Sequence, residues 1–348
     1  RSCQEFTPLH PMILRTKCLM PSSRTSMPRG CSGALRLAVL TERIAARRSS
    51  PPPALLLPRN CASHRIMFVS FSSRKGEAMQ RHIKAHQDGN YQEIVPPGTM
   101  RFLDFSRLLL PRHQKHTGET DAREYVLDIF GGQAQVTVET GARRQVFDRV
   151  GARADVFSGP PAMLYIPPAS TYTINATSDG FDAGLFSAPS KAATDAKLLD
   201  GSAVSAKQAG RDNWQRTVYS ALDENVPAER LLAGETVNPP GNWSSYPPHK
   251  HDRKNPPDEA VLEEIYFFRV KPAQGYGFIW TYTAPGDPEG FSTVFVVEDG
   301  DTVLLPKGYH PVVAAPGYQL HYTWVLAGEE RRYGAWADDP RHAWVKNQ

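Results

Sequence analysis

Hydrophobic and polar positions alternate over short segments from Met79 to the end of the chain. β-branched and aromatic residues dominate these segments, and Gly, Pro, Asp and Asn separate them. This pattern is typical of an all-β barrel or sandwich. The clearest strands are expected at 124–130, 134–139, 162–166, 264–270, 277–282, 292–297 and 319–326. Helical periodicity is scarce, and its clearest candidate is 212–222.

Two parts of this region share an order of events. A turn, a strand that ends in proline, a short loop and another strand occur in GPPAMLYIPPASTYTI at 159–174 and again in GDTVLLPKGYHPVVA at 300–314. A duplicated barrel explains this order economically. The second copy places His310 after its turn, where the first copy has Ser170, Thr171 and Tyr172. If one copy holds a metal, it is therefore the second.

The expected architecture is all-β, with two tandem barrels. The first barrel is expected at 79–190 without metal ligands, and the second, metal-binding barrel at 231–348. Residues 191–230 form the expected connector, which begins in an Ala/Lys/Gly/Ser-rich stretch and contains the short helix.

Composition sets residues 1–78 apart from the rest of the chain. They carry 13 Arg and Lys, only three acids and all four cysteines. We expect a largely disordered basic extension, either transit-like or a gene-model artefact. The remaining 270 residues have 27 bases, 33 acids and no cysteine. This balance argues against a nucleic-acid partner and excludes a disulfide framework there. No apolar run approaches the ~18 residues of a membrane span.

Candidate chemistry is concentrated in the second copy. His249 and His251, in GNWSSYPPHKHD at 241–252, are two residues apart, so on an extended strand they share a face and Lys250 points the other way. Glu263 or Glu264 opens the next strand, and PKGYHP at 306–311 returns His310. Three imidazoles and one carboxylate suit a divalent transition metal with open positions for substrate.

These residues also carry a family resemblance. The order of HxH, glutamate and PxGxH resembles the two motifs of cupins, although the interval DRKNPPDEAVL is longer than the usual cupin spacing. More narrowly, the chain over roughly 80–348 resembles the 5-deoxy-glucuronate isomerase family of myo-inositol catabolism. The segments that carry this resemblance are NPPGNWSSYPPHKHD at 238–252, LEEIYFFRV at 262–270, VEDGDTVLLPKGYHPV at 297–312 and AGEERR at 327–332.

The resemblance implies two tandem cupin (jelly-roll) barrels and an aldose–ketose isomerase, an intramolecular oxidoreductase. Such an enzyme converts 5-deoxy-D-glucuronate to 5-dehydro-2-deoxy-D-gluconate. In related uronate ketol-isomerases, three histidines and a glutamate hold zinc, and the glutamate precedes an aliphatic and two aromatic residues. Carried onto this sequence, the metal ligands are His249, His251, Glu264 and His310. Zinc is the expected ion, with manganese or iron as alternatives.

The expected reaction removes a proton beside the aldehyde and returns it to the former carbonyl carbon, through an enediolate that a Lewis-acidic metal stabilises. Tyr246, Tyr266 and Tyr309 are the expected substrate-binding residues because they lie near the ligands in sequence. The sequence does not single out the general base. Strand alternation aims Lys250 and Arg269 away from the barrel interior, so no cation is assigned to the substrate carboxylate.

Two alternatives remain open at this point. Three histidines and a glutamate in a cupin also suit a metal-dependent dioxygenase, and a bicupin can bind sugars without catalysis. The expected partner is a small sugar acid, with neither nucleic acid nor membrane, and self-association into a homo-oligomer is plausible. The expected location is cytoplasmic, or organellar if residues 1–78 are a genuine transit peptide.

Overall fold

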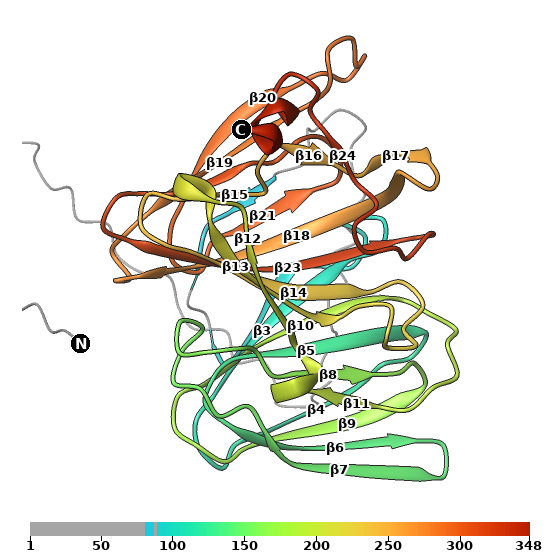
Figure 1. Cartoon of the computed structure of the whole chain (residues 1–348). Coiled ribbons are helices and arrows are strands. Elements are labelled where there is room, and N and C mark those ends of the chain that lie inside the picture. Colours follow the sequence, from blue (N-terminus) through green and yellow to red (C-terminus); the bar gives the residue numbers. More distant parts are fainter. Residues whose placement is uncertain (1–80, 87–88) are drawn as a thin grey trace, which may run out of the picture. The chain divides into compact units, whose positions relative to one another are not determined.

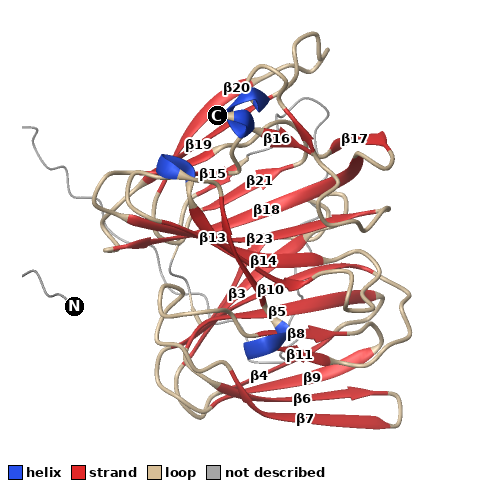
Figure 2. Cartoon of the chain, viewed as in Figure 1, coloured by secondary structure: helices blue, strands red, loops and turns tan. Residues whose placement is uncertain are grey.

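The computed structural model describes residues 81–86 and 89–348, which lie in one compact unit, Ser72–Gln348. Strands dominate this region (Figure 2). Helix is confined, within the described residues, to three short 3-10 segments, Gly201–Ala203 (η1), Asp212–Trp214 (η2) and Ala343–Asn347 (η3). The all-β prediction is confirmed. The extension expected at 1–78 lies outside the described residues.

The first barrel consists of two sheets that face each other. Its strands are β2 (Tyr91–Val95), β3 (Asp104–Leu110), β4 (Lys115–Glu119), β5 (Arg123–Gly131), β6 (Ala134–Thr140), β7 (Arg143–Val150), β8 (Met163–Ile166), β9 (Ser170–Ala176), β10 (Phe181–Pro189) and β11 (Lys197–Leu199). One sheet has the order β11-β8-β5-β10-β3-β2, and the other has the order β4-β9-β6-β7. Apolar side chains from both sheets fill the space between them.

The second barrel follows along the chain (Figure 1). Its strands are β12 (Ser205–Ala209), β13 (Arg216–Leu222), β14 (Leu232–Asn238), β15 (Trp243–Ser244), β16 (His249–Lys250), β17 (Asp252–Asn255), β18 (Glu259–Lys271), β19 (Gly277–Tyr282), β20 (Ser292–Val297), β21 (Thr302–Leu305), β22 (Val312–Ala314), β23 (Gln319–Gly328) and β24 (Ala337–Asp338), with β1 (His82–Ile83) at one edge. The large sheet has the order β1-β21-β18-β23-β14-β13-β12, and the smaller one the order β15-β22-β19-β20.

The two barrels repeat one topology. The run β8-β5-β10-β3 in the first barrel matches β21-β18-β23-β14 in the second, and β4-β9-β6-β7 matches β15-β22-β19-β20. All pairings within these four runs are antiparallel. The same strand order in both barrels is what a duplicated unit produces, in line with the order of turns and prolines in the sequence.

Edge strands complicate the expected boundaries between barrels. β1 precedes the first barrel in sequence but pairs with β21 of the second, as His82 opposite Val303. β11, in the expected connector, pairs with β8 of the first barrel, and β13 pairs with β14 of the second. The boundaries at 79, 191 and 231 therefore stay predictions, and the segment 191–230 contributes strands to both barrels.

The helix expected over 212–222 was wrong. Asp212–Trp214 forms one 3-10 turn, and Arg216–Leu222 is strand β13. Its sequence, RTVYSAL, contains the β-branched residues Thr217 and Val218 followed by Tyr219, which fit a pleated surface. Pairing with both β12 and β14 then outweighs the weak helical periodicity.

Strand β18 is buried on both faces, and its alternation organises the interior. Tyr266 and Phe268 belong to the apolar core of the second barrel. Ile265 and Phe267 instead belong to a core that the two barrels build together. Phe267 meets Phe130 of the first barrel at a ring-centroid distance of 4.8 Å. The side of β18 that faces away from its own barrel is thus covered by the other barrel.

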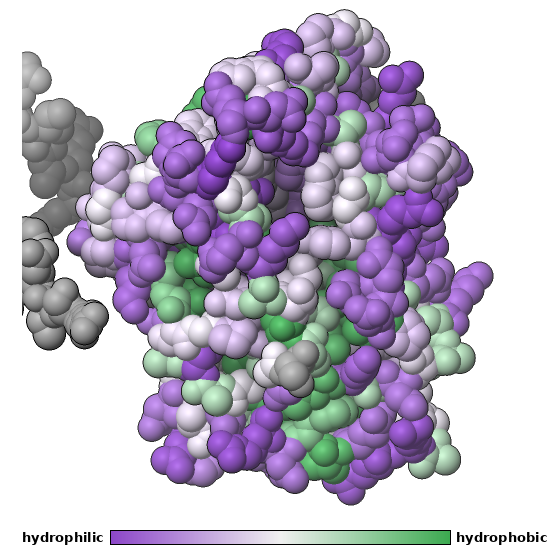
Figure 3. All heavy atoms as spheres, viewed as in Figure 1, coloured by the Kyte–Doolittle hydropathy of each residue, from purple (hydrophilic) through white to green (hydrophobic). Residues whose placement is uncertain are grey.

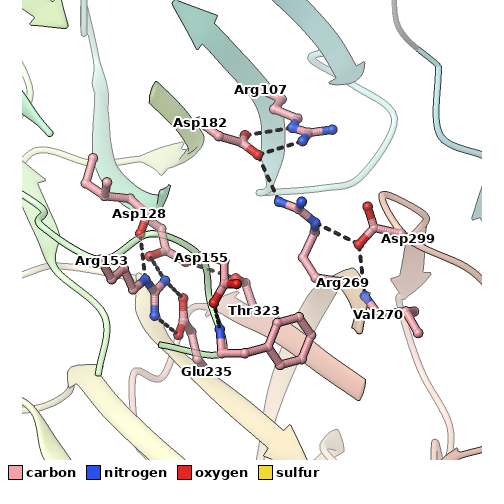
Figure 4. Close-up of polar contacts among 12 residues, drawn as sticks. Arg107, Asp128, Arg153, Asp155, Asp182, Glu235, Arg269, Val270, Asp299 and Thr323 are labelled. Carbon is pink, nitrogen blue, oxygen red and sulfur yellow. Dashed lines mark hydrogen bonds and ion pairs between the residues drawn. The ribbon is translucent and has the colours of Figure 1, made fainter. Parts of the chain in front are cut away.

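A buried polar cluster also joins the barrels (Figure 4). Arg153, between β7 and β8, forms a bidentate ion pair with Glu235 of β14. Asp128 of β5 accepts a 2.9 Å hydrogen bond from Thr323 of β23, and its other oxygen lies 3.9 Å from the Arg153 guanidinium. His321 Nε2 lies 3.2 Å from Glu235. Arg153 of the first barrel and Glu235 of the second therefore neutralise each other away from water.

The outer surface is mixed in character. On the face drawn in Figure 3, hydrophilic residues predominate over the second barrel, and hydrophobic residues gather over part of the first. Among residues 81–86 and 89–348, no helix combines the length and apolar character needed to cross a membrane.

Candidate metal centre

A hairpin positions the HxH segment. The long interval after His251 forms β17, a tight turn and the start of β18. Leu262 N–H donates a 2.9 Å hydrogen bond to the His251 carbonyl, and His251 Nδ1 lies 2.6 Å from the Leu262 carbonyl. The hairpin therefore holds His251 opposite Leu262, two positions before Glu264. The interval that departs from usual cupin spacing is what places these two side chains together.

The two neighbouring glutamates point in opposite directions. Glu264 is buried and lines a cavity in the second barrel together with His249 and His251. Glu263 faces the first barrel, where its carboxylate accepts backbone N–H bonds from Arg101, Phe102 and Leu103. The strand alternation that selected Glu264 over Glu263 agrees with these positions.

A glycine turn delivers His310. Gly308 has a φ of +96°, and a Cβ there would lie 2.6 Å from the Tyr282 carbonyl oxygen. Only glycine meets both conditions without strain. The Gly308 carbonyl lies 2.9 Å from His310 Nδ1, and the His310 side chain is fully buried.

Three of the four expected ligands converge. His251 Nε2 lies 3.1 Å from Glu264 Oε2, and His310 Nε2 lies 3.4 Å from the same oxygen. One ligand atom from each of these residues lies within 4.8 Å of the others. Among the described residues this is the group of His and acidic side chains with the geometry to hold a metal ion.

The protonation pattern of this group calls for a cation. The Leu262 and Gly308 carbonyls can only accept, so Nδ1 of both His251 and His310 carries the hydrogen in the neutral ring and Nε2 is left as a lone pair. Both lone pairs face a Glu264 oxygen, which is also an acceptor. His310 Nε2 is buried and has no hydrogen-bond partner among the described residues. Acceptors that converge in this way, with backbone bonds behind them, are typical of metal ligands.

The electrostatic shifts follow from the same arrangement. Burial, reinforced by the charge of His251, lowers the pKa of His310 to about 3. Burial disfavours protonation of His251, but the hydrogen bond and charge of Glu264 outweigh it and raise the pKa of His251. Burial raises the pKa of Glu264, against the lowering effect of His251 and Tyr266. Without an ion, His251 would itself supply the positive charge that this site needs.

His249 stands at the edge of this group. Its ring centroid lies 4.8 Å from that of His310 and 6.3 Å from that of His251. The side chain is half-buried, lines the cavity and packs against Trp336 at 5.1 Å. Burial and the two neighbouring imidazoles lower its pKa well below the ordinary value. His249 is thus neutral and adjacent to the other three residues, but it is not one of the tight group.

Of the three expected substrate-binding tyrosines, Tyr266 alone lines this cavity. Its hydroxyl lies 2.9 Å from Ser245 Oγ. Tyr322 extends this hydrogen-bond network, since its hydroxyl donates to Ser244 at 2.9 Å and lies 3.4 Å from Ser245. Burial raises the pKa of Tyr266 well above the ordinary value, so this hydroxyl keeps its proton.

The other two tyrosines lie elsewhere. Tyr246 lines a separate, larger cavity of about 560 Å³, where its ring meets those of Trp214 and Trp243. Tyr309 is buried against Tyr282, with ring centroids 5.0 Å apart. Neither position supports the predicted contact with a ligand in the His251 cavity, although both residues neighbour the ligands in sequence.

Sequence reasoning missed both arginines that line this cavity, Arg216 and Arg332. Arg216, at the start of β13, lines it together with His249, Glu264 and Tyr266. Because a helix is expected over 212–222, the sequence does not assign Arg216 to the cavity wall. The alternating, β-branched character of RTVYSAL was the available signal, because a strand there would have put Arg216 on a barrel wall.

Similar folds occur among solved structures. An IolB-like protein from Salmonella typhimurium LT2 superposes with a TM-score of 0.71 at 28% identity, covering 77% of this chain and 99% of that one. The oxalate decarboxylase of Lactobacillus farciminis, as a formate complex, gives a TM-score of 0.53 at 12% identity, covering 78% and 92%. This second likeness bears on the fold alone, and it confirms the cupin-type barrels predicted from the sequence.

Curated sequences give a closer likeness. The 5-deoxy-glucuronate isomerase of Geobacillus kaustophilus (strain HTA426) is 36% identical over 262 residues, which are 75% of this chain and 92% of the relative. That of Bacillus subtilis (strain 168) is 32% identical over 272 residues, 76% and 97% of the two chains. The model of the KduI/IolB family matches residues 78–345. With the match spanning both barrels and the candidate metal centre, the chain belongs to the KduI/IolB family.

Proposed function

We propose that this protein is a 5-deoxy-glucuronate isomerase that converts the aldose 5-deoxy-D-glucuronate to the ketose 5-dehydro-2-deoxy-D-gluconate. Its curated relatives carry that activity in their names at 32–36% identity. The convergence of His251, Glu264 and His310 in a cavity of the second barrel is the observation that carries the proposal. Such a site suits a redox-neutral proton transfer that needs charge stabilisation.

We further propose that His249, His251, Glu264 and His310 hold one divalent ion, with zinc as the expected metal. Zinc accepts both imidazole nitrogen and carboxylate oxygen as ligands, and the neutral state of His310 and His249 suits coordination. When bound, the ion supplies Lewis-acid stabilisation of negative charge on the substrate oxygens.

The chain's own residues would orient the substrate and hold protons in place. Tyr266 stays protonated and borders the cavity next to Glu264, so it can donate a hydrogen bond to a substrate oxygen. Ser245 forms a hydrogen bond with the Tyr266 hydroxyl, and the Tyr322 hydroxyl lies 3.4 Å from the same Ser245 oxygen. Leu232, Leu262 and Trp324 add apolar surface to the cavity wall.

The test is incubation of the full chain, loaded with zinc, with 5-deoxy-glucuronate while NMR follows the aldehyde signal. Loss of the aldehyde with appearance of the ketose is expected, and a chelator should stop it. In D₂O, deuterium exchange at the transferred position would report the proton transfer itself.

Absence of turnover by the zinc-, manganese- and iron-loaded protein would contradict the isomerase proposal. Consumption of oxygen with the same substrate would instead indicate a dioxygenase. Binding of the sugar acid without conversion would indicate a non-catalytic bicupin.

A further inference from the structure

The proposed substrate carries a carboxylate, which requires a cation in or beside the cavity. Most cations near the candidate metal centre are already neutralised. Lys250 pairs with Asp252 and Glu259 at 2.6 Å each. Lys307 pairs with Asp287 and Glu289, and Arg269 pairs with Asp182 and Asp299. These three side chains are held by their own acids and do not line the cavity.

Arg216 differs from them in position and in partners. It lines the cavity with His249, Glu264 and Tyr266, and its charge is close enough to His249 to disfavour protonation of that ring. Among the described residues no carboxylate lies within ion-pairing distance of its guanidinium. The protein acceptor that it reaches is the Trp214 carbonyl, 3.3 Å from Nη1.

The guanidinium of Arg216 therefore lacks an ion-pair partner among the described residues. The guanidinium has five N–H donors and cannot lose its charge. Arg216 is half-buried, and its burial lowers its pKa, which reflects the cost of removing the charge from water. Its charge neighbours are Tyr266, Tyr322 and Tyr333, which line this cavity with it, and Glu264 lines the same cavity without forming an ion pair with it. Such a group is poised for an anionic ligand, because a carboxylate would provide both charge and paired acceptors.

We propose that Arg216 binds the carboxylate of the substrate and thereby selects sugar acids over neutral sugars. This inference rests on the proposed function for the identity of the substrate. Arg216 is a specificity-determining residue in this scheme. It fixes the end of the sugar remote from the aldehyde, while the group around Glu264 receives the reacting end.

Arg332 is the competing cation, because it also lines the cavity. It is exposed, however, and its guanidinium donates to the Pro257 carbonyl at 3.2 Å. A carboxylate bound there would stay in contact with water, where an ion pair contributes little. Arg332 therefore serves as the matched control for Arg216.

The test compares a charged and a neutral ligand on the zinc-loaded full chain. The charged probe is the substrate with its aldehyde reduced to an alcohol, which cannot isomerise. The neutral probe replaces its carboxylate with a hydroxymethyl group. Calorimetry should show that Arg216→Met weakens binding of the charged probe about 10–100-fold, the range for a lost charge-assisted hydrogen bond. Binding of the neutral probe should change less than about threefold. Arg216→Lys should give an intermediate loss of affinity for the charged probe, because lysine keeps the charge but lacks the planar guanidinium that can bind a carboxylate through two N–H groups.

Three outcomes would overturn the inference: equal binding of the charged probe by the wild-type protein and Arg216→Met, an equal loss for both probes, or a loss confined to Arg332→Met. Failure of the wild-type protein to bind the charged probe would also overturn it. Circular dichroism verifies that each variant is folded. Because these probes require no turnover, Arg216-dependent binding without isomerisation of 5-deoxy-glucuronate would contradict the proposed function and leave the carboxylate site supported.

Discussion

Backbone carbonyls determine which atoms of the candidate metal centre are available. The Leu262 carbonyl engages His251 Nδ1, and the Gly308 carbonyl engages His310 Nδ1. Each bond fixes the tautomer and aims Nε2 at Glu264. Removing one imidazole therefore removes a preoriented lone pair, which solvent cannot replace in a buried site.

His310→Ala is expected to abolish metal retention. The wild-type protein should retain about one divalent ion per chain after dialysis, and the variant close to none, as measured by elemental mass spectrometry. His116→Ala is the control, because His116 stacks on Tyr91 in the first barrel and should leave the metal content unchanged. A His310→Ala protein that still retains one equivalent would show that the ion binds elsewhere.

Residue parity is the part of the site that the sequence predicts well. His249 and His251 face the cavity and Lys250 does not, and Glu264 is selected over Glu263 by the same two-residue period. Proximity in sequence is a weaker guide. Tyr246 and Tyr309 lie next to the ligands along the chain, yet turns carry them to other environments. Such placements depend on loop geometry that no alternation pattern contains.

At the scale of elements, the turn before His310 combines two constraints at one position. Gly308 has a positive φ, and its Cα faces the Tyr282 carbonyl too closely for a Cβ. The turn also pairs Tyr309 with Tyr282 through two backbone hydrogen bonds, of 2.7 and 3.0 Å. A substitution at Gly308 therefore strains the element that presents His310.

Gly308→Ala should lower the free energy of unfolding by about 1–3 kcal/mol, measured by urea denaturation. It should also weaken zinc binding, because the His310 ring is displaced with the turn. Gly286→Ala is a matched control: Gly286 also has a positive φ, of +85°, but nothing lies within 4 Å of an added Cβ. Equal losses for the two variants would mean that the contact with Tyr282 contributes nothing.

Most strands are predictable from this sequence because their apolar and polar residues alternate. β13 and the edge strands are not predictable in this way. The segments at 277–282 and 292–297 coincide with β19 and β20. The segment 212–222 is ambiguous because Trp214, Val218 and Leu222 also fit a helical period. Pairing of β13 with β12 and β14 favours the strand. With β13 misassigned, Arg216 could not be placed on the cavity wall.

At the scale of the whole described unit, packing of one barrel on the other determines which charges are buried. The sequence indicates that β18 has apolar residues on both faces, but it does not say what covers the second face. The answer is the first barrel, whose Phe105 and Phe130 both pack against Phe267. Asp128 and Glu235, about a hundred residues apart in sequence, meet in the same interface. Contacts between such distant positions leave no local pattern in a single sequence.

This buried cluster predicts an unusual pH dependence of stability. Burial, together with the charge of Glu235, raises the pKa of Asp128 well above its usual value. A raised carboxyl pKa means that the contribution of Asp128 to stability is complete below the ordinary pKa of 3.8 and is lost as the pH rises through the folded-state pKa. One Asp128 oxygen also lacks a hydrogen-bond partner among the described residues. Asp128 therefore costs stability at neutral pH.

Asp128→Asn should consequently stabilise the protein at pH 7 by about 1–3 kcal/mol, the usual cost of an unsatisfied buried polar group. The amide keeps an oxygen for Thr323 and turns an N–H toward Glu235. In urea denaturation from pH 3 to pH 8, this gain should shrink as the pH falls through 3.8, because Asp128 is protonated in both states only below that value. Asp155→Asn should show the opposite sign, because hydrogen bonds from Ser158 and Lys271 overcome burial and lower the pKa of Asp155. A destabilising Asp128→Asn at pH 7 would instead mean that the Asp128 charge is needed to balance Arg153 between the two barrels.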